Sequence, residues 1–437
     1  MDMASTNENK YIGAAAILEK KKKYIMPCLG HFYSDPRQIV RGEMQYLYDS
    51  EGRKYLDCFA GVSVINCGHC NPAINAAVTE QLNTLQHVCN IYLTENFVNL
   101  AEQLARITPG KLQKSFFCST GTEANEGAAL LAQIATGSSE FIALRGGLHG
   151  RTKLTMSLTG ISMWRTDPNP VGGIHFVKNP YCYRCPHKHT PEECGIDCTY
   201  ELEETIKSAT SGRPAAFIAE TIQGNAGIIV PPKNYFKRVK EILDHYGVLF
   251  IADEVQTGFA RTGKMFAIEH FGVVPDIMTM AKALGNGAPI SAFIATPEVA
   301  DTYTKPGAST LGGNPVSTMA GLEVIRYIEE HDLIGNAERR GAQLRAGLRE
   351  IQKRHPIIGD IRGLGLMVGA EFVHADKSPA AAELDMVLEE LKNRGFIIGK
   401  NGIGRNVMAF QPPLIITEDN ISDVLNAVEL VLTEKGL

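Results

Sequence analysis

The chain has 437 residues, of which 44% are hydrophobic and 21% are charged, and its 43 basic and 48 acidic residues leave a formal net charge of −5. This composition is typical of a folded protein with a large core, and it excludes a mainly disordered, collagen-like or coiled-coil chain. The sequence has no long basic block and no apolar stretch of about 18 residues, so we expect neither nucleic acid nor a membrane as a partner. Residues 1–10 are too polar for a signal peptide, and we expect a cytoplasmic protein.

Residues 1–74 are predicted to form the first part of a small domain. A helix is expected at 14–23. The segments at 45–49 and 54–57 alternate apolar and polar residues, which predicts two strands joined by a short turn. This part of the chain therefore mixes helix and strand.

Residues 75–315 show a different pattern, in which helices alternate with short apolar strands. The predicted strands are 115–118, 140–144, 215–219, 248–252 and 277–280. Because strands of this kind are buried on both faces, the pattern predicts a large α/β domain with a mostly parallel sheet flanked by helices. Residues 316–437 alternate helix and strand again, and we expect them to complete the small α/β domain together with residues 1–74.

A first candidate site follows the strand at 115–118, where residues 119–126 open a helix. Small residues at the N-terminus of a helix expose backbone N–H groups to an anion, so this segment is a candidate phosphate cradle. Residues of the same kind also occur as ordinary helix caps, and the segment alone does not distinguish the two interpretations.

Two further candidates, Asp253 and Lys282, follow the predicted strands at 248–252 and 277–280. Ligands of open α/β sheets bind at the carboxyl ends of the strands, so both side chains are expected at the binding edge. A lysine at the end of a buried segment loses hydration, which lowers its pKa and makes it a nucleophile towards aldehydes. Together with a carboxylate for a ring cation and a phosphate cradle, this lysine meets the requirements of pyridoxal 5′-phosphate (PLP).

In combination, several motifs make the sequence resemble the class III, fold-type I, PLP-dependent aminotransferases over essentially the whole chain. The motifs lie at residues 66–72, 119–126, 251–258, 280–283, 285–287, 310–315 and 360–366. The branch that it most resembles is the alanine:glyoxylate, or β-aminoisobutyrate:pyruvate, aminotransferase group. The resemblance implies a homodimer, or a dimer of dimers, that uses PLP.

The resemblance also implies catalytic roles for three residues. Lys282 would hold the aldehyde of the cofactor and carry the proton during turnover, and Asp253 would pair with the pyridinium nitrogen. Glu220 would be the active-site glutamate that usually pairs with a substrate-binding arginine.

Further matching residues would contact the cofactor. Gly121 and Thr122 would bind the phosphate, and Gln256 would hydrogen-bond the phenolic oxygen. The remaining contacts would come from Leu148, His149 and Val255 around the ring and from Thr310 of the second subunit.

Two positions depart from the pattern of the family. Leu148 stands where members usually have an aromatic residue stacked on the cofactor, and Ala409 stands where they usually have an arginine that grips the substrate α-carboxylate. Arg405 and Arg41 are the candidate replacements for this arginine. We therefore expect the amino donor to be a β- or ω-amino acid or a related amine, and the acceptor to be a small 2-oxo acid such as pyruvate or glyoxylate, in a ping-pong reaction through pyridoxamine phosphate.

Two other functions remain open at this point. One is a PLP-dependent lyase or amino-acid epimerase on the same scaffold, which would need no oxo-acid acceptor. The other is a binding protein without enzymatic activity that has kept the scaffold.

Four cysteines are close together in the sequence, at Cys182, Cys185, Cys194 and Cys198. Their spacing could hold a structural zinc ion, or the segment could be a surface loop with reduced thiols. We expect no metal in the active site.

Overall fold

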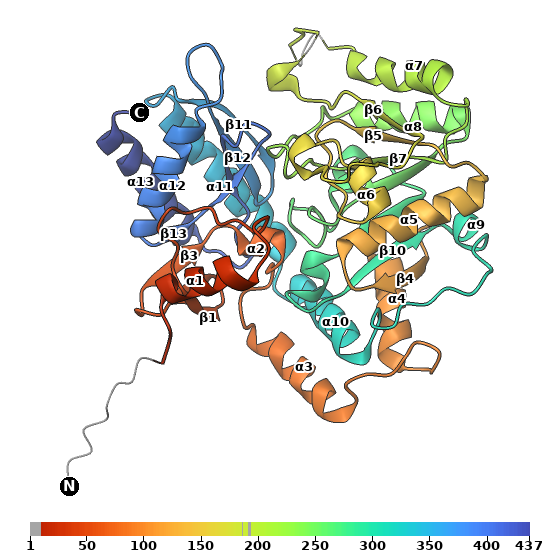
Figure 1. The fold of residues 1–437 in the computed structure, drawn as a ribbon, viewed down its shortest axis with the longest axis horizontal. Coiled ribbons are helices and arrows are strands. Elements are labelled where there is room, and N and C mark those ends of the chain that lie inside the picture. The colour runs from red at the N-terminus through yellow and green to blue at the C-terminus, as the bar shows by residue number, and fades with distance from the viewer. Residues whose placement is uncertain (1–9, 186, 191–193) are drawn as a thin grey trace.

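The computed structural model describes residues 10–185, 187–190 and 194–437 (Figure 1). Residues 1–9, on which the signal-peptide prediction for residues 1–10 mostly falls, lie outside the described residues. In the described part of the chain, no helix is long and apolar enough to cross a membrane.

A seven-stranded sheet forms the centre of the larger lobe, with the strand order β4-β10-β9-β8-β7-β5-β6. Its strands are β4 (Lys114–Cys118), β5 (Phe141–Leu144), β6 (Ile174–Val177), β7 (Ala216–Glu220), β8 (Leu249–Asp253), β9 (Ile277–Met280) and β10 (Ser291–Ala295). β10 pairs antiparallel with both β4 and β9, whereas the pairs from β9 to β6 are parallel. The structure confirms the mostly parallel sheet, and it adds β6 and β10, which the sequence analysis did not identify.

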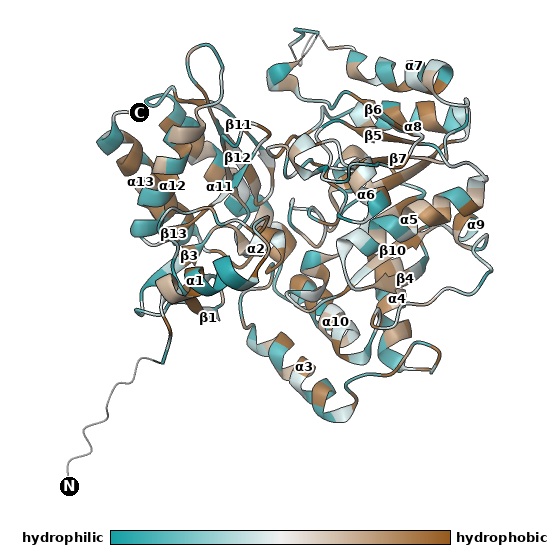
Figure 2. Ribbon diagram, in the orientation of Figure 1, coloured by the Kyte–Doolittle hydropathy of each residue, from teal (hydrophilic) through white to brown (hydrophobic). Residues whose placement is uncertain are grey.

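The central strands are buried on both faces, as their apolar sequences predict. In β8, Ile251 packs in the core cluster that contains residues of α5 (Gly121–Thr136), while Phe250 and Ala252 pack in the cluster that contains residues of α8 (Tyr235–Tyr246). Figure 2 shows that helices such as α5 and α8 carry both hydrophobic and hydrophilic residues. Helices with one apolar face therefore cover both sides of the sheet.

The other helices of this lobe surround the sheet and its edges. They are α3 (Pro72–Thr84), α4 (Glu95–Ile107), α6 (Lys153–Leu158), α7 (Tyr200–Ala209), α9 (Pro297–Ala300) and α10 (Pro315–Glu330). Short 3-10 turns lie at Ser162–Trp164, Cys182–Arg184, Asp197–Thr199, Ala267–Phe271 and Lys282–Gly285. α10 packs against α3, α4 and the turn at Lys282–Gly285, so it belongs to the packing of this lobe.

The smaller lobe contains segments from both ends of the chain. One sheet has the order β1-β2-β3-β13, and a second has the order β11-β12-β15-β14. The strands are β1 (Ile39–Glu43), β2 (Tyr46–Asp49), β3 (Lys54–Asp57), β11 (Ile358–Leu364), β12 (Met367–Phe372), β13 (Phe396–Ile397), β14 (Gly399–Asn401) and β15 (Val407–Phe410). The helices are α1 (Ala14–Tyr24), α2 (Ala60–Ser63), α11 (Leu333–Gln352), α12 (Ala381–Asn393) and α13 (Glu418–Lys435).

β3 and β13 join the two ends of the chain, because they pair in parallel with Leu56 opposite Phe396. Figure 1 shows the red N-terminal elements beside the blue C-terminal ones. A division of the chain into domains at residues 74 and 315 stays a prediction.

The topology places the candidate residues at one edge of the large sheet. β4, β7, β8 and β9 all run in the same direction, so their carboxyl ends meet at this edge. Glu220 and Asp253 are the last residues of neighbouring strands and stand opposite each other in the register. Lys282 follows β9 by two residues, and the predicted phosphate cradle directly follows β4.

Candidate active site

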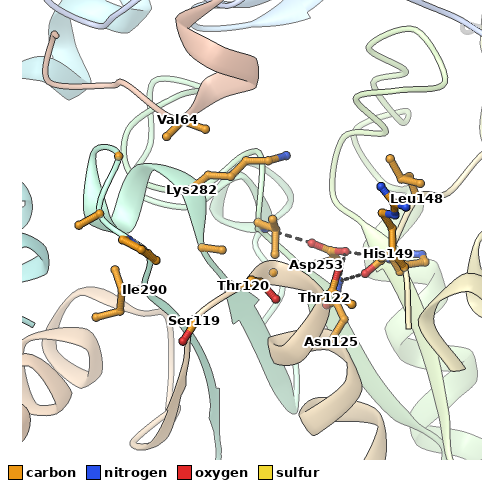
Figure 3. A pocket seen from close by; sticks show the side chains of 18 of the residues that line it. Val64, Ser119, Thr120, Thr122, Asn125, Leu148, His149, Asp253, Lys282 and Ile290 are labelled. Carbon is orange, nitrogen blue, oxygen red and sulfur yellow. Dashed lines mark hydrogen bonds and ion pairs between the residues drawn. The ribbon is translucent and has the colours of Figure 1, made fainter. Parts of the chain in front are cut away.

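A cavity of about 380 Å³ opens at this edge of the sheet (Figure 3). Seven of the residues predicted for the cofactor site line it, namely Gly121, Thr122, Leu148, His149, Asp253, Val255 and Lys282. Asn125, Arg151 and Trp164 also line it, and the sequence analysis did not identify them. Val64, directly after α2, contributes from the smaller lobe, so the cavity lies between the two lobes.

The cradle at the start of α5 is built around a capping box. The Thr120 hydroxyl accepts the backbone N–H of Glu123 at 3.2 Å, and the Glu123 carboxylate accepts the N–H groups of Ser119 and Thr120 at 2.9 Å. The next two N–H groups, those of Gly121 and Thr122, have no acceptor among the described residues. Glycine at position 121 leaves room for Val255, because a Cβ atom there would lie 2.8 Å from Val255 Cγ1. These free N–H groups and the positive end of the helix dipole can hold a phosphate.

Lys282 stands in the cavity at the start of a 3-10 turn, with its side chain half-buried. Its φ of 48° lies in the left-handed region, which is unfavourable for a residue with a side chain. Loss of hydration lowers the pKa of its ammonium group, and the nearby Asp253 and Glu220 carboxylates oppose this effect. A lysine whose pKa is lowered reaches the neutral, nucleophilic form more readily.

Three donors fix the Asp253 carboxylate. Asn125 Nδ2 donates to Asp253 Oδ2 at 2.8 Å, and His149 Nδ1 lies 2.8 Å from the same oxygen (Figure 3). The backbone N–H of Val255 donates to Oδ1 at 3.1 Å. The Thr279 hydroxyl donates to Asn125 Oδ1 at 2.7 Å, which turns the amide so that its NH₂ group faces Asp253.

Glu220 is buried and does not line the cavity. Its Oε1 accepts the backbone N–H of Leu148 at 2.8 Å, and its Oε2 accepts the N–H of Gly224 at 2.9 Å. Burial, together with repulsion from Asp253, raises the pKa of this carboxyl to about 7, although the two N–H groups act against the shift. Glu220 has no arginine partner among the described residues.

Gln256 is buried with both polar atoms of its side-chain amide unpaired. Its Oε1 lies so close to Gly224 that a Cβ atom there would be only 1.4 Å away. A buried amide without a partner is unfavourable, so these atoms fit a hydrogen bond to a group that binds in the site.

The two predicted arginines do not line the cavity of this chain. The Arg41 guanidinium is half-exposed, forms an ion pair with Glu43 at 2.6 Å and stacks on the Tyr48 ring at 3.5 Å. Arg405 is exposed in the turn between β14 and β15, with a φ of 55°. Their roles as substrate-binding residues stay predictions.

Arg151 is the arginine that the structure places at the cavity. Its side chain is exposed, and it has no hydrogen-bond or ion-pair partner among the described residues. The sequence signal for it was its position directly after His149 and Gly150, a segment already assigned to the cofactor. The corresponding signal for Asn125 was its position one helical turn after Gly121, on the same side of α5.

Ala409 is fully buried in an apolar cluster with Ile222, Ile228, Ala267 and Met367. In β15 it pairs with a strand on each side, standing opposite Gly369 of β12 and Gly399 of β14. In this chain, position 409 therefore supplies no charged group.

The four neighbouring cysteines are all half-buried and free. Among the described residues there is no group of three or more His, Cys, Asp or Glu side chains that could hold a metal ion. Residues 186 and 191–193, which lie within the same segment, are outside the described part of the chain.

The sequence matches known aminotransferases over most of its length. The profile of the aminotransferase class-III family matches residues 32–432. This chain belongs to the class-III aminotransferases. Over 429 residues it is 41% identical to the mitochondrial alanine–glyoxylate aminotransferase 2 homolog 2 of Arabidopsis thaliana, with 97% of this chain and 89% of that protein covered. It is also 37% identical to a leucine/methionine racemase of Thermococcus litoralis, over 96% of this chain and 95% of that protein.

The fold agrees with this assignment. The structure is similar to that of the omega transaminase from Pseudomonas jessenii in complex with PMP, with a TM-score of 0.87 and 30% sequence identity. The match covers 95% of this chain and 97% of that one. The class-III aminotransferase fold is the PLP-dependent fold type I, and the cofactor of this enzyme is PLP.

The residues of the cavity fit this cofactor. The cradle has two free N–H groups for a phosphate, and Lys282 stands near the fixed carboxylate of Asp253. Gln256, which is buried and does not line the cavity, has two unpaired polar atoms. Gly150 keeps the cavity open beside the cradle, because a Cβ atom there would lie 2.7 Å from Thr122 Oγ1.

Proposed function

We propose that this aminotransferase takes its amino group from a β- or ω-amino acid, or a related amine, and passes it to a small 2-oxo acid such as pyruvate or glyoxylate. The observation that carries the proposal is the environment of Glu220, whose two oxygens are occupied by backbone N–H groups. At position 409 an alanine is buried among apolar side chains. A guanidinium that could grip an α-carboxylate through two hydrogen bonds is therefore missing from this side of the site.

Arg151 supports the same donor class. Its unpaired guanidinium lines the cavity, together with Trp164, whose ring is 40% exposed. In this proposal Arg151 binds a carboxylate that lies away from the reacting amine, and Trp164 covers the carbon chain between the two groups. Such an arrangement suits a β- or ω-amino acid better than an α-amino acid.

The catalytic residues divide the chemistry among them. PLP, when bound, supplies the electron sink that lets the carbon bearing the amine lose its proton. Lys282 would move this proton, and its lowered pKa favours the neutral form that can accept it. Asp253 would pair with the ring nitrogen. Glu220 stands opposite Asp253 on the neighbouring strand and does not line the cavity.

The other cofactor contacts in this proposal are those that the family resemblance implies. Gly121 and Thr122 would hold the phosphate, and Gln256 would donate to the phenolic oxygen. His149, Val255 and Leu148 enclose the ring. Because Leu148 has no aromatic face, it excludes water from the ring without stacking on it.

A single-turnover half-reaction tests the donor class. The holoenzyme is mixed, without any oxo acid, with L-alanine, β-alanine, taurine, longer ω-amino acids and phosphoethanolamine, and the absorbance of the cofactor is followed. Stoichiometric conversion to pyridoxamine phosphate by β- or ω-amino donors, and much slower conversion by L-alanine, is the expected result. Fast conversion by L-alanine alone would overturn the proposed donor class.

Replacing Arg151 separates the carboxylate contact from the chemistry. We expect R151M to slow the half-reaction with β-alanine by about 10- to 100-fold, the loss of one charge-assisted contact. The rate with isopropylamine, which has no carboxylate, should stay unchanged. R145M is the matched control, because Arg145 is exposed, pairs with Glu201 at 3.4 Å and does not line the cavity.

A racemase is the second candidate, favoured by the 37% identity to the leucine/methionine racemase. In that case the proton that Lys282 removes would return to the same carbon. Loss of optical activity in a single amino acid, with the cofactor remaining in its aldehyde form, would establish this function.

We also propose that the active enzyme is a homodimer, alone or paired into a dimer of dimers. Ile91, Tyr92 and Leu93 form a continuous exposed apolar segment, and Leu93 is 100% exposed. Thr310 is exposed two residues before Gly312, which packs against Cys118 at the end of β4. A second copy would cover the apolar segment and bring its Thr310 to the neighbouring phosphate cradle.

Sedimentation of charge variants tests the dimer. L93D should give monomers with weakened PLP binding, and L430D, which places the same charge on an exposed face of α13, should leave the dimer intact. A dimeric L93D enzyme would show that this segment is not the interface.

The cytoplasmic location stays part of the proposal. The comparisons do not decide it, because the Arabidopsis relative is named as mitochondrial. Fractionation of the producing cells, followed by detection of the enzyme in each fraction, tests this location directly.

A further inference from the structure

A tight backbone turn at residues 224–228 lies between Glu220 and the smaller lobe. It is closed by the N–H groups of Gly227 and Ile228, which donate to the Gly224 carbonyl at 3.0 and 3.1 Å. At its start, the N–H of Gly224 donates to Glu220 Oε2. The turn therefore supplies one of the two donors that hold the Glu220 carboxylate.

The smaller lobe holds this turn at three points. Asn401, buried in β14, donates its side-chain amide to the Gly224 carbonyl at 3.0 Å. The N–H of Gly402 donates to the Asn225 carbonyl at 3.0 Å, and Arg362 Nε of β11 donates to the Gly227 carbonyl at 2.9 Å. All three contacts reach main-chain carbonyls, so they fix the path of the turn.

The turn has no free space on either side. A Cβ atom on Gly224 would collide with Gln256, and one on Gly227, whose φ is 117°, would lie 3.0 Å from Arg362 and from Val407. The turn is thus enclosed between Gln256, which is predicted to contact the cofactor, and the smaller lobe. The main-chain pairing of Gln223 with Ile229, at 3.2 and 3.0 Å, holds the peptide that carries the Gly224 N–H on one side. Because a glycine has no side chain to restrict its φ and ψ, the direction of this N–H also depends on the contacts to the Gly224 carbonyl on the other side.

We propose that Asn401 is a positioning residue, which fixes the Glu220 carboxylate through the Gly224 turn and so makes the recognition of the amino donor depend on the smaller lobe. This inference rests on the proposed function in that it takes the charge of Glu220, which lies behind the cavity wall, to influence the recognition of the amino donor. Asn401 is far along the chain from the predicted catalytic residues and does not line the cavity. Its contact with the turn is the hydrogen bond to the Gly224 carbonyl, which Gly227 and Ile228 also hold.

The chemistry of Glu220 gives the direction of the effect. The N–H of Gly224 stabilises the ionised carboxylate, against a pKa that burial raises to about 7. If Asn401 no longer holds the Gly224 carbonyl, the N–H loses its alignment and the carboxyl is protonated at higher pH. At neutral pH a smaller share of the enzyme then carries the charge.

Variants at Asn401 test the proposal in the holoenzyme. N401A removes the donor, and N401L removes it while keeping most of the side-chain volume and adding no charge. The cofactor absorbance and the β-alanine half-reaction are measured against pH, and the midpoint of each response reports the titration of Glu220. We expect each variant to raise this midpoint by about one pH unit, because the hydrogen bond from the Gly224 N–H to the charged Glu220 carboxylate is weakened. The half-reaction at pH 7 should slow by about tenfold, and the KM for pyruvate should change less.

Asn406 provides the matched control. It is a buried asparagine of the same lobe whose amide donates to a main-chain carbonyl, that of Phe372, at 2.7 Å. N406A therefore removes an equivalent hydrogen bond without touching the turn. It should lower the melting temperature as N401A does and leave the pH midpoint unchanged. An equal midpoint shift in both variants would overturn the proposal, since it would show a general effect of loosening the lobe.

A double-mutant cycle with E220Q separates the two hypotheses. If Asn401 acts through Glu220, N401A has no further effect on the pH response in the E220Q background. Additive effects would overturn the positioning role. If E220Q leaves the preference for β-alanine over L-alanine unchanged, the proposed substrate role of Glu220 is wrong. If N401A in the same experiments shifts the pH midpoint only when Glu220 is present, the link between Asn401 and Glu220 stands.

Discussion

Asn125 donates its side-chain amide to Asp253 at 2.8 Å, which connects the helix that carries the phosphate cradle to the strand that carries the carboxylate. Asn125 lies four residues after Gly121, so it points from the same side of α5. The same amide also donates to the His149 carbonyl at 2.8 Å. One helical turn thus sets the distance between the N-terminus of α5 and the Asp253 carboxylate.

Replacement of Asn125 should weaken cofactor binding. N125A removes a hydrogen bond to a charged group, worth about 1.5–3 kcal/mol, so the dissociation constant for PLP should rise by about 10- to 100-fold. Fluorescence titration of the apoenzyme with PLP measures this. T279V removes only the donor that orients Asn125, and its effect should be smaller. An unchanged affinity in N125A would show that Asp253 does not need this contact.

Loss of the lysine should stop turnover without unfolding the protein. K282A removes the proton-transfer group, and we expect the half-reaction to slow by at least about 10²- to 10⁴-fold. Stopped-flow absorbance with a saturating donor gives this rate. K264A, at an exposed lysine of the same lobe, should react at the normal rate. Turnover by K282A at a rate near that of the parent enzyme would exclude Lys282 as the proton carrier.

The stability of the apoenzyme should fall as the pH rises between about 5 and 7. Burial raises the pKa of Glu220 and of Glu254 to about 7, above the ordinary value of 4.5, so the folded state binds more protons than the unfolded state in this range. As the pH rises from the unfolded to the folded pKa value, each group lowers the free energy of unfolding by at most about 3 kcal/mol, because one pKa unit corresponds to about 1.4 kcal/mol.

Melting temperatures at several pH values test this linkage. E220Q cannot ionise and should flatten the decline. E350Q, at an exposed glutamate whose pKa is lowered by Lys353, should keep the decline of the parent protein. A decline that is equally steep in E220Q would show that Glu220 does not titrate in this range.

An arginine at position 409 should shift the donor preference towards α-amino acids. The A409R side chain would place a guanidinium in the cluster that contains Ile222 and Met367. Ile222 is two residues from Glu220 in the sequence, so the Glu220 carboxylate can pair with this guanidinium. Overpacking should also destabilise the enzyme by about 1–3 kcal/mol. Relative half-reaction rates for L-alanine and β-alanine measure the preference. A409L is the control for size, and an equal change in both variants would rule out the carboxylate argument.

The sequence alone determined the residues that follow the buried strands. Lys282, Asp253 and the cradle at residues 119–126 could be predicted, because a short apolar run shows where a strand ends and a parallel sheet gathers these ends at one edge. The α/β fold class could be predicted for the same reason. These signals are local, and they do not depend on how distant segments pack.

Only the tertiary structure decided which other groups reach the site. Nothing in the local sequence shows that Asn125 reaches Asp253, that Arg151 lines the cavity while Arg41 pairs with Glu43, or that Asn401 reaches Gly224 across 177 positions of the chain. β10 likewise enters the sheet antiparallel between β4 and β9. Contacts of this kind depend on the packing of lobes and strands far apart in sequence, and a hydrogen bond forms only where that packing brings donor and acceptor to about 3 Å.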